Sequence, residues 1–247
     1  MSSSNLLFNI LDQVDSTNNY AMEMINKEQA IHGNAYLAHY QTQGRGQRGK
    51  KWDSLPGQNL TMSVILKPSG DFIDKPFLFN AFIAVEIATF VEDFIQEKVM
   101  IKWPNDIYIR DRKAGGILIE NKIRGENWNW SVTGIGLNIN QFEFINTPNK
   151  PISLIEITKQ KIHIEEFAQS LHGKLLKSFA SNSNTNGEKI LQDYNNRLFK
   201  AGIAVQLKKN NVVFETTIKE VNSAGQLITV DVNEQHFEFG EVEWILT

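Results

Sequence analysis

The sequence predicts an α+β fold, in which a larger mixed region up to about residue 198 precedes a small all-β region. Two patterns along the 247 residues carry this prediction. Up to about residue 198, apolar residues at helical spacing alternate with short β-branched runs. After Gly202, five short strands separated by Asn, Ser and Gly turns fill about 45 residues, which is typical of a small barrel. An apolar fraction of 41% is enough to build a buried core.

The first half of the chain predicts two helices and two strands. Asp15 to Asn18 offer N-cap side chains for a helix over about 17–28. Strands are expected over 35–41 and 59–67, where β-branched and apolar residues dominate. The spacing of apolar residues predicts a long central helix over 76–98, with Asp74 as its cap and Pro76 in its first turn.

The middle of the chain predicts a strand over 99–103, which Pro104 ends, followed by a hairpin around Asp111 to Lys113. A further strand is expected over 128–140. Beyond it, the pattern predicts an amphipathic helix over 164–179, a polar loop over 181–187 and a short helix over 188–198. The five predicted strands of the all-β region lie between 203 and 247.

The composition excludes several classes of protein. There is no cysteine, which excludes disulfides, thiolate zinc sites and a cysteine nucleophile. The formal charge of −3 argues against general nucleic-acid binding. The N-terminus has no basic region before its apolar run, and no apolar stretch approaches the roughly 20 residues that span a bilayer. We therefore expect a cytoplasmic protein with no membrane association.

The most unusual stretch is QTQGRGQRGKKW, residues 41–52, which concentrates glycines and cations on one loop. It differs from a P-loop because Lys51 replaces the required Ser or Thr, and because Pro56 and Gly57 prevent a following helix. Taken alone, an anion site and an ordinary surface turn with solvated charges are equally good interpretations. The sequence therefore leaves both open at this point.

Three other clusters lie at predicted strand ends: KWPND at 102–106, DRKAGGILIE at 111–120 and GIGLNIN at 134–140. Each has an ordinary alternative as a turn or a hairpin tip. Glycines within the last cluster are typical of a strand that a ligand approaches closely. If these strand ends lie side by side with the glycine-rich loop, they form a cleft.

These clusters, together with DSTN at 15–18, resemble the motifs of biotin–protein ligases in their order and spacing, along essentially the whole chain. The resemblance implies a mixed sheet flanked by helices, similar to the class II aminoacyl-tRNA synthetase core, over 1–198. It implies an SH3-like barrel over 199–247. It also implies that biotin and MgATP form biotinyl-adenylate and pyrophosphate. The biotinyl group then passes to a lysine of a biotin carboxyl carrier domain, in acetyl-CoA carboxylase or a related biotin-dependent enzyme.

The resemblance also assigns roles to residues. Lys113, Arg45 and Arg48 are the implied catalytic cations. The implied biotin-binding residues are Ser16, Thr17, Asn18, Gln41, Arg45, Gly46, Gln47, Lys113, Gly116, Gly134 and Gly136. The implied ATP-binding residues are Arg45, Arg48, Lys50, Trp52, Lys102, Asn105, Lys113 and Asn138. The five histidines show no ligand spacing, so we expect no metal site built from the protein alone and Mg²⁺ held largely by the phosphates of ATP.

Some features depart from the family pattern or stay open. Gln47 is neutral where many members carry Arg, and Lys50 stands where Arg is usual. The chain begins at the catalytic region, so we expect no helix-turn-helix and no DNA-binding role. Asp106 is both a candidate base for the transfer step and an ordinary turn-forming residue. Neither the acceptor nor the oligomeric state follows from the sequence, so a homodimer stays open. The alternative functions are a lipoate–protein ligase and a non-catalytic SH3-like adaptor.

Overall fold

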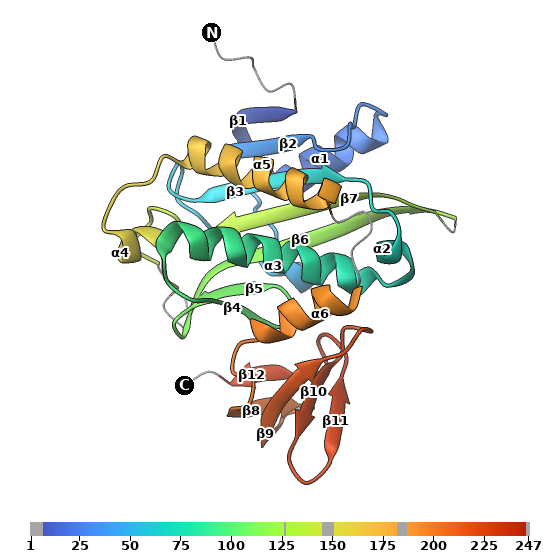
Figure 1. Cartoon of the computed structure of the whole chain (residues 1–247). Coiled ribbons are helices and arrows are strands. Elements are labelled where there is room, and N and C mark those ends of the chain that lie inside the picture. The colour runs from blue at the N-terminus through green and yellow to red at the C-terminus, as the bar shows by residue number, and fades with distance from the viewer. Residues whose placement is uncertain (1–6, 126, 145–150, 182–186, 246–247) are drawn as a thin grey trace.

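The computed structural model describes residues 7–125, 127–144, 151–181 and 187–245. Its centre is a seven-stranded sheet in the order β1-β2-β3-β7-β6-β5-β4 (Figure 1). The strands are β1 Phe8–Val14, β2 Ala35–Gln41, β3 Leu60–Leu66, β4 Val99–Lys102, β5 Asp106–Ile109, β6 Arg112–Arg124 and β7 Asn127–Leu137. The β1–β2 pair is parallel and the other pairs are antiparallel, so the sheet is mixed as predicted.

Two long helices cover one face of this sheet and a shorter one covers the other (Figure 1). The helices are α1 Thr17–Asn26, α2 Asp71–Asp74, α3 Pro76–Ile95, α4 Leu154–Thr158, α5 Ile164–Ser181 and α6 Gly187–Asn196. Successive strand residues point to opposite faces. Accordingly, Leu37 belongs to the main core under α3 and α5, whereas Tyr36 packs with Ala21 and Ile25 of α1.

The C-terminal strands form a second sheet in the order β11-β10-β9-β8-β12, in which every pair is antiparallel. They are β8 Ala204–Lys209, β9 Val212–Val221, β10 Leu227–Val230, β11 Glu234–Phe237 and β12 Glu243–Ile245. This sheet is fixed to the rest by specific bonds. Asn195 exchanges two hydrogen bonds with the backbone of Val221, and the Trp103 indole donates to the Gly225 carbonyl at 2.9 Å.

Most predicted elements are present, with changes at their ends. The first helix ends at Asn26 rather than about 28, and α3 ends at Ile95 because Gln96 adopts a left-handed conformation. Asp74 does not cap α3, which was a wrong prediction. It closes the short helix α2, and Lys75 occupies the cap position without a side-chain bond. The strand β1 and the short helices α2 and α4 were not predicted from the sequence. Of the polar loop predicted over 181–187, residues 182–186 lie outside the described residues.

Candidate active site

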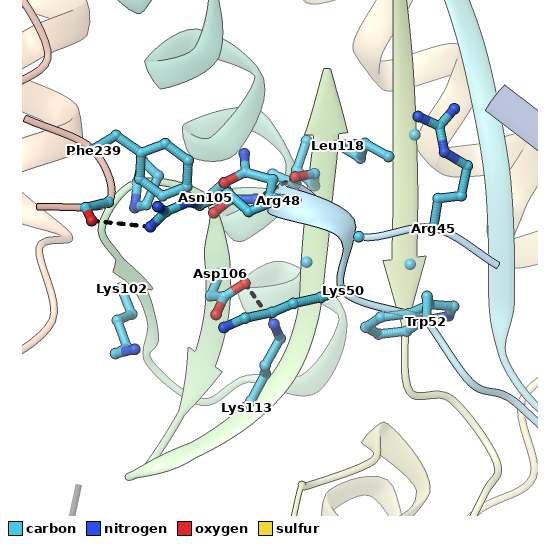
Figure 2. Close-up of a pocket in the computed structure, with 18 of the residues that line it drawn as sticks. Arg45, Arg48, Lys50, Trp52, Lys102, Asn105, Asp106, Lys113, Leu118 and Phe239 are labelled. Atoms are coloured by element: carbon cyan, nitrogen blue, oxygen red, sulfur yellow. Dashed lines mark hydrogen bonds and ion pairs between the residues drawn. The ribbon is translucent and has the colours of Figure 1, made fainter. Parts of the chain in front are cut away.

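A cavity of about 1070 Å³ lies on the α1 face of the large sheet and reaches the edge of the C-terminal sheet (Figure 2). Sixteen of the seventeen predicted site residues line it: Ser16, Thr17, Asn18, Gln41, Arg45, Gly46, Gln47, Arg48, Lys50, Trp52, Lys102, Asn105, Lys113, Gly116, Gly134 and Gly136. Segments that are distant in sequence therefore form one hollow, as expected if the strand ends lie side by side.

One end of the cavity is a buried, neutral hydrogen-bond network. The backbone N–H and the hydroxyl of Thr17 both donate to Gln41 Oε1, at 2.7 and 3.1 Å. The Ser63 hydroxyl lies 2.7 Å from Thr17 Oγ1 and 2.6 Å from Asn18 Oδ1. Ser16 occupies the N-cap position of α1, but its side chain makes no capping bond. The network fixes α1 against β2 and β3 and presents polar groups to the cavity.

Two strand glycines are needed for side chains of the protein itself. A Cβ on Gly134 would lie 2.3 Å from Asn18 Oδ1, and a Cβ on Gly136 would lie 2.6 Å from the Trp52 ring. Asn18 also donates to Glu120 at 2.8 Å. Asn18 and Trp52 therefore occupy the space beside these glycines, and all four residues line the cavity. The prediction that the glycines let a ligand approach the strand stays a prediction.

The glycine-rich loop folds back on itself as a tight hairpin. Gly46 N–H donates to the Lys50 carbonyl at 2.7 Å, and Trp52 N–H donates to the Gly44 carbonyl at 3.0 Å. Gly44 is required because a Cβ there would lie 2.2 Å from the Trp52 carbonyl oxygen. No helix follows this hairpin until α2, so the loop lacks the helix N-terminus of a P-loop.

Both loop arginines have protein partners, and they lie apart in Figure 2. Arg45 forms a two-pronged ion pair with Glu120, at 2.9 and 3.1 Å, and donates to Asn19 at 2.7 Å. Arg48 donates to the Gly240 carbonyl at 3.0 Å, with its guanidinium carbon 5.9 Å from the centre of the Phe239 ring. The two arginines therefore attach the loop to different parts of the protein, Arg45 to β6 and Arg48 to the connection between β11 and β12.

The lysines gather at the other end of the cavity, next to Asp106 (Figure 2). Lys113 Nζ lies 2.6 Å from Asp106 Oδ1, across the β5–β6 hairpin. Lys102 Nζ lies 5.3 Å from the Trp244 ring centre and 5.7 Å from that of Tyr108. Burial lowers the pKa of Lys102, the charges of Lys113 and Lys50 lower it further, and Asp106 opposes them.

Asn138 is the predicted site residue that does not line the cavity. Its buried side chain donates to the Ile152 carbonyl at 3.2 Å and lies 3.4 Å from the Lys113 carbonyl. It thus holds the backbone beside Lys113. Asn105 does line the cavity, and its amide donates to the Ile117 carbonyl of β6.

Sequence reasoning missed two parts of the site. The C-terminal region supplies a wall of the cavity through Lys208, Asn210, Asn211 and residues 239–244, more than 150 positions from the glycine-rich loop. Glu120 is the last residue of the DRKAGGILIE motif, but its pairing with Arg45 was not predicted. The available signal for the wall was Gly240, placed directly after Phe239 near the predicted last strand.

The described residues contain neither a cluster of metal ligands nor a membrane-spanning helix. Within 7–125, 127–144, 151–181 and 187–245, no group of three or more His, Asp or Glu side chains is arranged to hold a metal ion. In the same part of the chain, no helix is long and apolar enough to cross a membrane.

Comparison with known proteins gives matches in sequence and in structure. Residues 10–138 match the biotin/lipoate A/B protein ligase family. The chain is 36% identical over 130 residues to the bifunctional ligase/repressor BirA of Escherichia coli, covering 53% of this chain and 40% of BirA. It is 33% identical over 132 residues to the biotin–[acetyl-CoA-carboxylase] ligase of Paracoccus denitrificans, covering 53% of each. The chain thus spans about half or less of these relatives.

The fold is also similar to that of a biotin protein ligase from Aquifex aeolicus solved in complex with biotin and ATP. The TM-score is 0.81 at 21% identity, covering 98% of this chain and 100% of that one. This likeness confirms the predicted architecture of a mixed sheet flanked by helices with a C-terminal β-sheet. Because the sequence match extends over more than half of its residues, the chain belongs to the biotin/lipoate A/B protein ligase family.

Proposed function

We propose that the protein attaches biotin to a lysine of a biotin carboxyl carrier domain, through a biotinyl-5'-adenylate intermediate. The observation that carries the proposal is a single cavity with a neutral, hydrogen-bonding end at Thr17 and Gln41 and a cationic end at Lys102 and Lys113. The first end suits the uncharged ureido head of biotin. The second suits a carboxylate and a triphosphate held together.

In the first step, a carboxylate oxygen of biotin attacks the α-phosphorus of ATP. The bond between that phosphorus and the bridging oxygen breaks, and pyrophosphate leaves. Two unit charges about 4 Å apart repel by about 4 kcal/mol at an effective dielectric constant of about 20. Arg45, Arg48 and Lys113 are the cations that we propose offset this repulsion, and Arg suits forked contact with phosphate oxygens.

The remaining residues would orient the two substrates. Ser16, Thr17, Asn18 and Gln41 would bind the biotin head, with Gly116, Gly134 and Gly136 along its path. Trp52, Lys50, Lys102 and Asn105 would surround the nucleotide. Mg²⁺ would arrive with ATP and depend largely on phosphate oxygens for its coordination. The chemistry that this ion supplies is neutralisation of phosphate charge.

In the second step, the neutral amine of an acceptor lysine attacks the acyl carbon of the mixed anhydride. The bond from this carbon to the phosphate oxygen breaks, AMP leaves, and the amine gives up a proton. A free lysine is mostly protonated at neutral pH, so a base is needed. Asp106 is our candidate, because its carboxylate lines the cavity next to Lys113.

We further propose a division of labour, with 1–198 binding biotin and ATP and 199–247 completing the cavity. The carrier domain of acetyl-CoA carboxylase, or of a related biotin-dependent enzyme, is the proposed acceptor, in line with the name of the Paracoccus relative. We also propose a cytoplasmic location, in keeping with such an acceptor. A lipoate ligase is the main alternative, because the matching family includes both activities.

Mass spectrometry tests the proposal directly. The protein is incubated with MgATP, a carrier domain and either biotin or lipoate. We expect a biotinyl mass increase on the carrier domain and none with lipoate. Lys113→Ala should lower adenylate formation by about 100-fold or more, because one fixed charge at the reacting centre is typically worth several kcal/mol.

Lys174→Ala is the matched control, because Lys174 is also a partly exposed lysine in an ion pair, with Asp93 at 3.0 Å, but lies on α5 away from the cavity. It should retain wild-type activity. Lipoyl transfer without biotinyl transfer would overturn the proposed substrate. Full activity of a folded Lys113→Ala variant would overturn the role of this lysine.

A further inference from the structure

The glycine-rich loop is attached at two points, one on the large sheet and one on the C-terminal region. Arg45 pairs with Glu120 of β6, whereas Arg48 contacts the segment between β11 and β12. Directly after Arg48 the hairpin has few supports outside itself, since Gly49 has no atom within 4 Å of where a Cβ would lie, and Lys50 is exposed. The position of the loop over the cavity therefore depends on these two arginines.

Arg48 binds between Phe239 and Gly240, and we call these three residues the Arg48 clip. Its guanidinium donates to the Gly240 carbonyl at 3.0 Å and lies 5.9 Å from the Phe239 ring centre. A carbonyl and an aromatic face are both favourable partners for a guanidinium. The backbone of Arg48 is left-handed, with φ 54° and ψ 40°, which is disfavoured for a residue with a side chain. The contacts of the clip offset that cost.

Gly240 is specifically suited to this contact. A Cβ there would lie 2.2 Å from Arg48 Nη1, and the φ of +90° also disfavours any other residue. Phe239 is in turn held by Trp103, at 5.9 Å between ring centres in an edge-to-face arrangement. The Trp103 indole donates to the Gly225 carbonyl of the C-terminal sheet. The clip thus connects the loop, the strand end at Trp103 and the C-terminal sheet.

We infer that Phe239 and Gly240 are positioning residues, which hold Arg48 so that the C-terminal sheet keeps the glycine-rich loop over the cavity. The effect of these residues on the adenylate rests on the proposed function. A mixed anhydride is lost to water unless the site excludes it, and a covering loop provides that exclusion. Phe239 and Gly240 would therefore set how long the adenylate is retained, by holding Arg48 and without contacting the adenylate themselves.

The competing interpretation is that Arg48 acts only as a phosphate ligand and that its contact with Gly240 is incidental. The two interpretations predict different results for Gly240→Ala. This variant keeps the charge of Arg48 but displaces its guanidinium from the Gly240 carbonyl and the Phe239 ring. Gly202→Ala is the matched control, because Gly202 has a similar φ of +75°, lies just before β8, and has nothing within 4 Å of where a Cβ would lie. Both variants carry backbone strain, but only one displaces Arg48.

The first measurement does not depend on the proposed function. Arg45, Arg48, Lys50 and Lys51 make the loop a substrate for trypsin once it opens. Cleavage within 45–51 of the ligand-free protein is followed by mass spectrometry. We expect Gly240→Ala to be cut there about tenfold faster than wild type, and Gly202→Ala to stay within about twofold, since cleavage reports the open population. Equal rates for all three proteins would overturn the clip.

The second measurement tests the consequence. Adenylate retention is measured after removal of free biotin and ATP. Gly240→Ala and Phe239→Leu should shorten the retention time of the adenylate about tenfold. Phe239→Tyr keeps an aromatic face for Arg48 and should retain the adenylate like wild type. The biotin affinity of all three variants should stay within about twofold of wild type. Unchanged retention despite faster cleavage would overturn the link to the adenylate. If wild type forms no adenylate, the proposed function fails, while the cleavage result still decides on the clip.

Discussion

Charged side chains of the cavity are paired with groups of the protein itself. Arg45 has Glu120, Lys113 has Asp106, and Arg48 has the Gly240 carbonyl. An unpaired cation in a recess is costly, so partners are expected. The carboxylates of these pairs remain 24 to 26% exposed, and partly exposed ion pairs contribute little net free energy. Under the proposed function, the carboxylate of biotin and the phosphates of ATP would take over these cations at a small cost in free energy.

Among single side chains, the hydroxyl of Thr17 offers the most direct test of the proposed biotin site. It donates to Gln41 and lies within hydrogen-bond distance of Ser63, and the residue is 4% exposed. Thr17→Val keeps the shape but leaves buried polar partners unsatisfied, which typically costs about 1–3 kcal/mol. We expect biotin affinity to fall by about 10- to 100-fold in isothermal titration.

Thr42→Val is the control for this change, because Thr42 directly follows Gln41, the partner of Thr17, but is exposed, with only a long 3.4 Å bond to the Val14 carbonyl. It should bind biotin like wild type. Equal binding by Thr17→Val would show that the network near α1 does not recognise biotin, and would weaken the assignment of that end of the cavity.

At the scale of elements, a glycine in strand β7 and a glycine in helix α5 have opposite effects on stability. Gly134 has no room for a Cβ because Asn18 occupies the space, and Asn18 is itself bonded to Glu120. Gly173 lies within α5 with nothing within 4 Å of a Cβ position. A glycine inside a helix without such a constraint is destabilising relative to alanine.

These two glycines give opposite predictions for stability. Gly134→Ala should lower the unfolding free energy by about 2 kcal/mol through overpacking, and should also weaken biotin binding. Gly173→Ala should raise it by about 0.5–1 kcal/mol. For a chain of this size, about 1 kcal/mol corresponds to roughly 2–4 °C in Tm. Thermal unfolding of both variants checks the pair, and a stabilised Gly134→Ala would contradict the packing argument.

The elements that the sequence predicted well are those with a strong local signal. The apolar periodicity of α3 and the β-branched run of β3 can be recognised from residues that are close together in the sequence. By contrast, β1 alternates weakly and is half exposed, and α2 and α4 have four and five residues. Asp74 was misassigned because a capping residue has the same local appearance whether it ends one helix or begins the next.

At the scale of the whole molecule, the two sheets share one hydrophobic cluster. Leu207, Ile218 and Val221 of the C-terminal sheet belong to the same cluster as Leu37 and Met62 of the large sheet. This explains why the contribution of the C-terminal region to the cavity could not be predicted from the sequence. Motifs show which residues have unusual chemistry, but which distant segment packs against them is decided by tertiary contacts with large sequence separation.

The stability of the whole chain should depend on pH through a buried histidine. His172 on α5 is 1% exposed, with Nε2 2.7 Å from the Gly33 carbonyl. Burial lowers its pKa, partly opposed by the bond to Gly33. Burial also lowers the pKa of His32, and the Lys67 charge lowers it further. Both histidines therefore gain a proton more readily in the unfolded chain.

The sign of the effect follows from that difference. Above the unfolded pKa of about 6.5, these groups are neutral in both states and contribute no pH dependence. As the pH falls below about 6.5, the unfolded state binds more protons, so the free energy of unfolding decreases until the lower folded pKa is reached. We expect the denaturant midpoint to fall between about pH 7 and 5. His172→Gln, which keeps a donor for Gly33, should flatten this slope, whereas His163→Gln, at an exposed position, should leave it unchanged. A slope that His172→Gln does not alter would mean that other groups set the acid sensitivity of the fold.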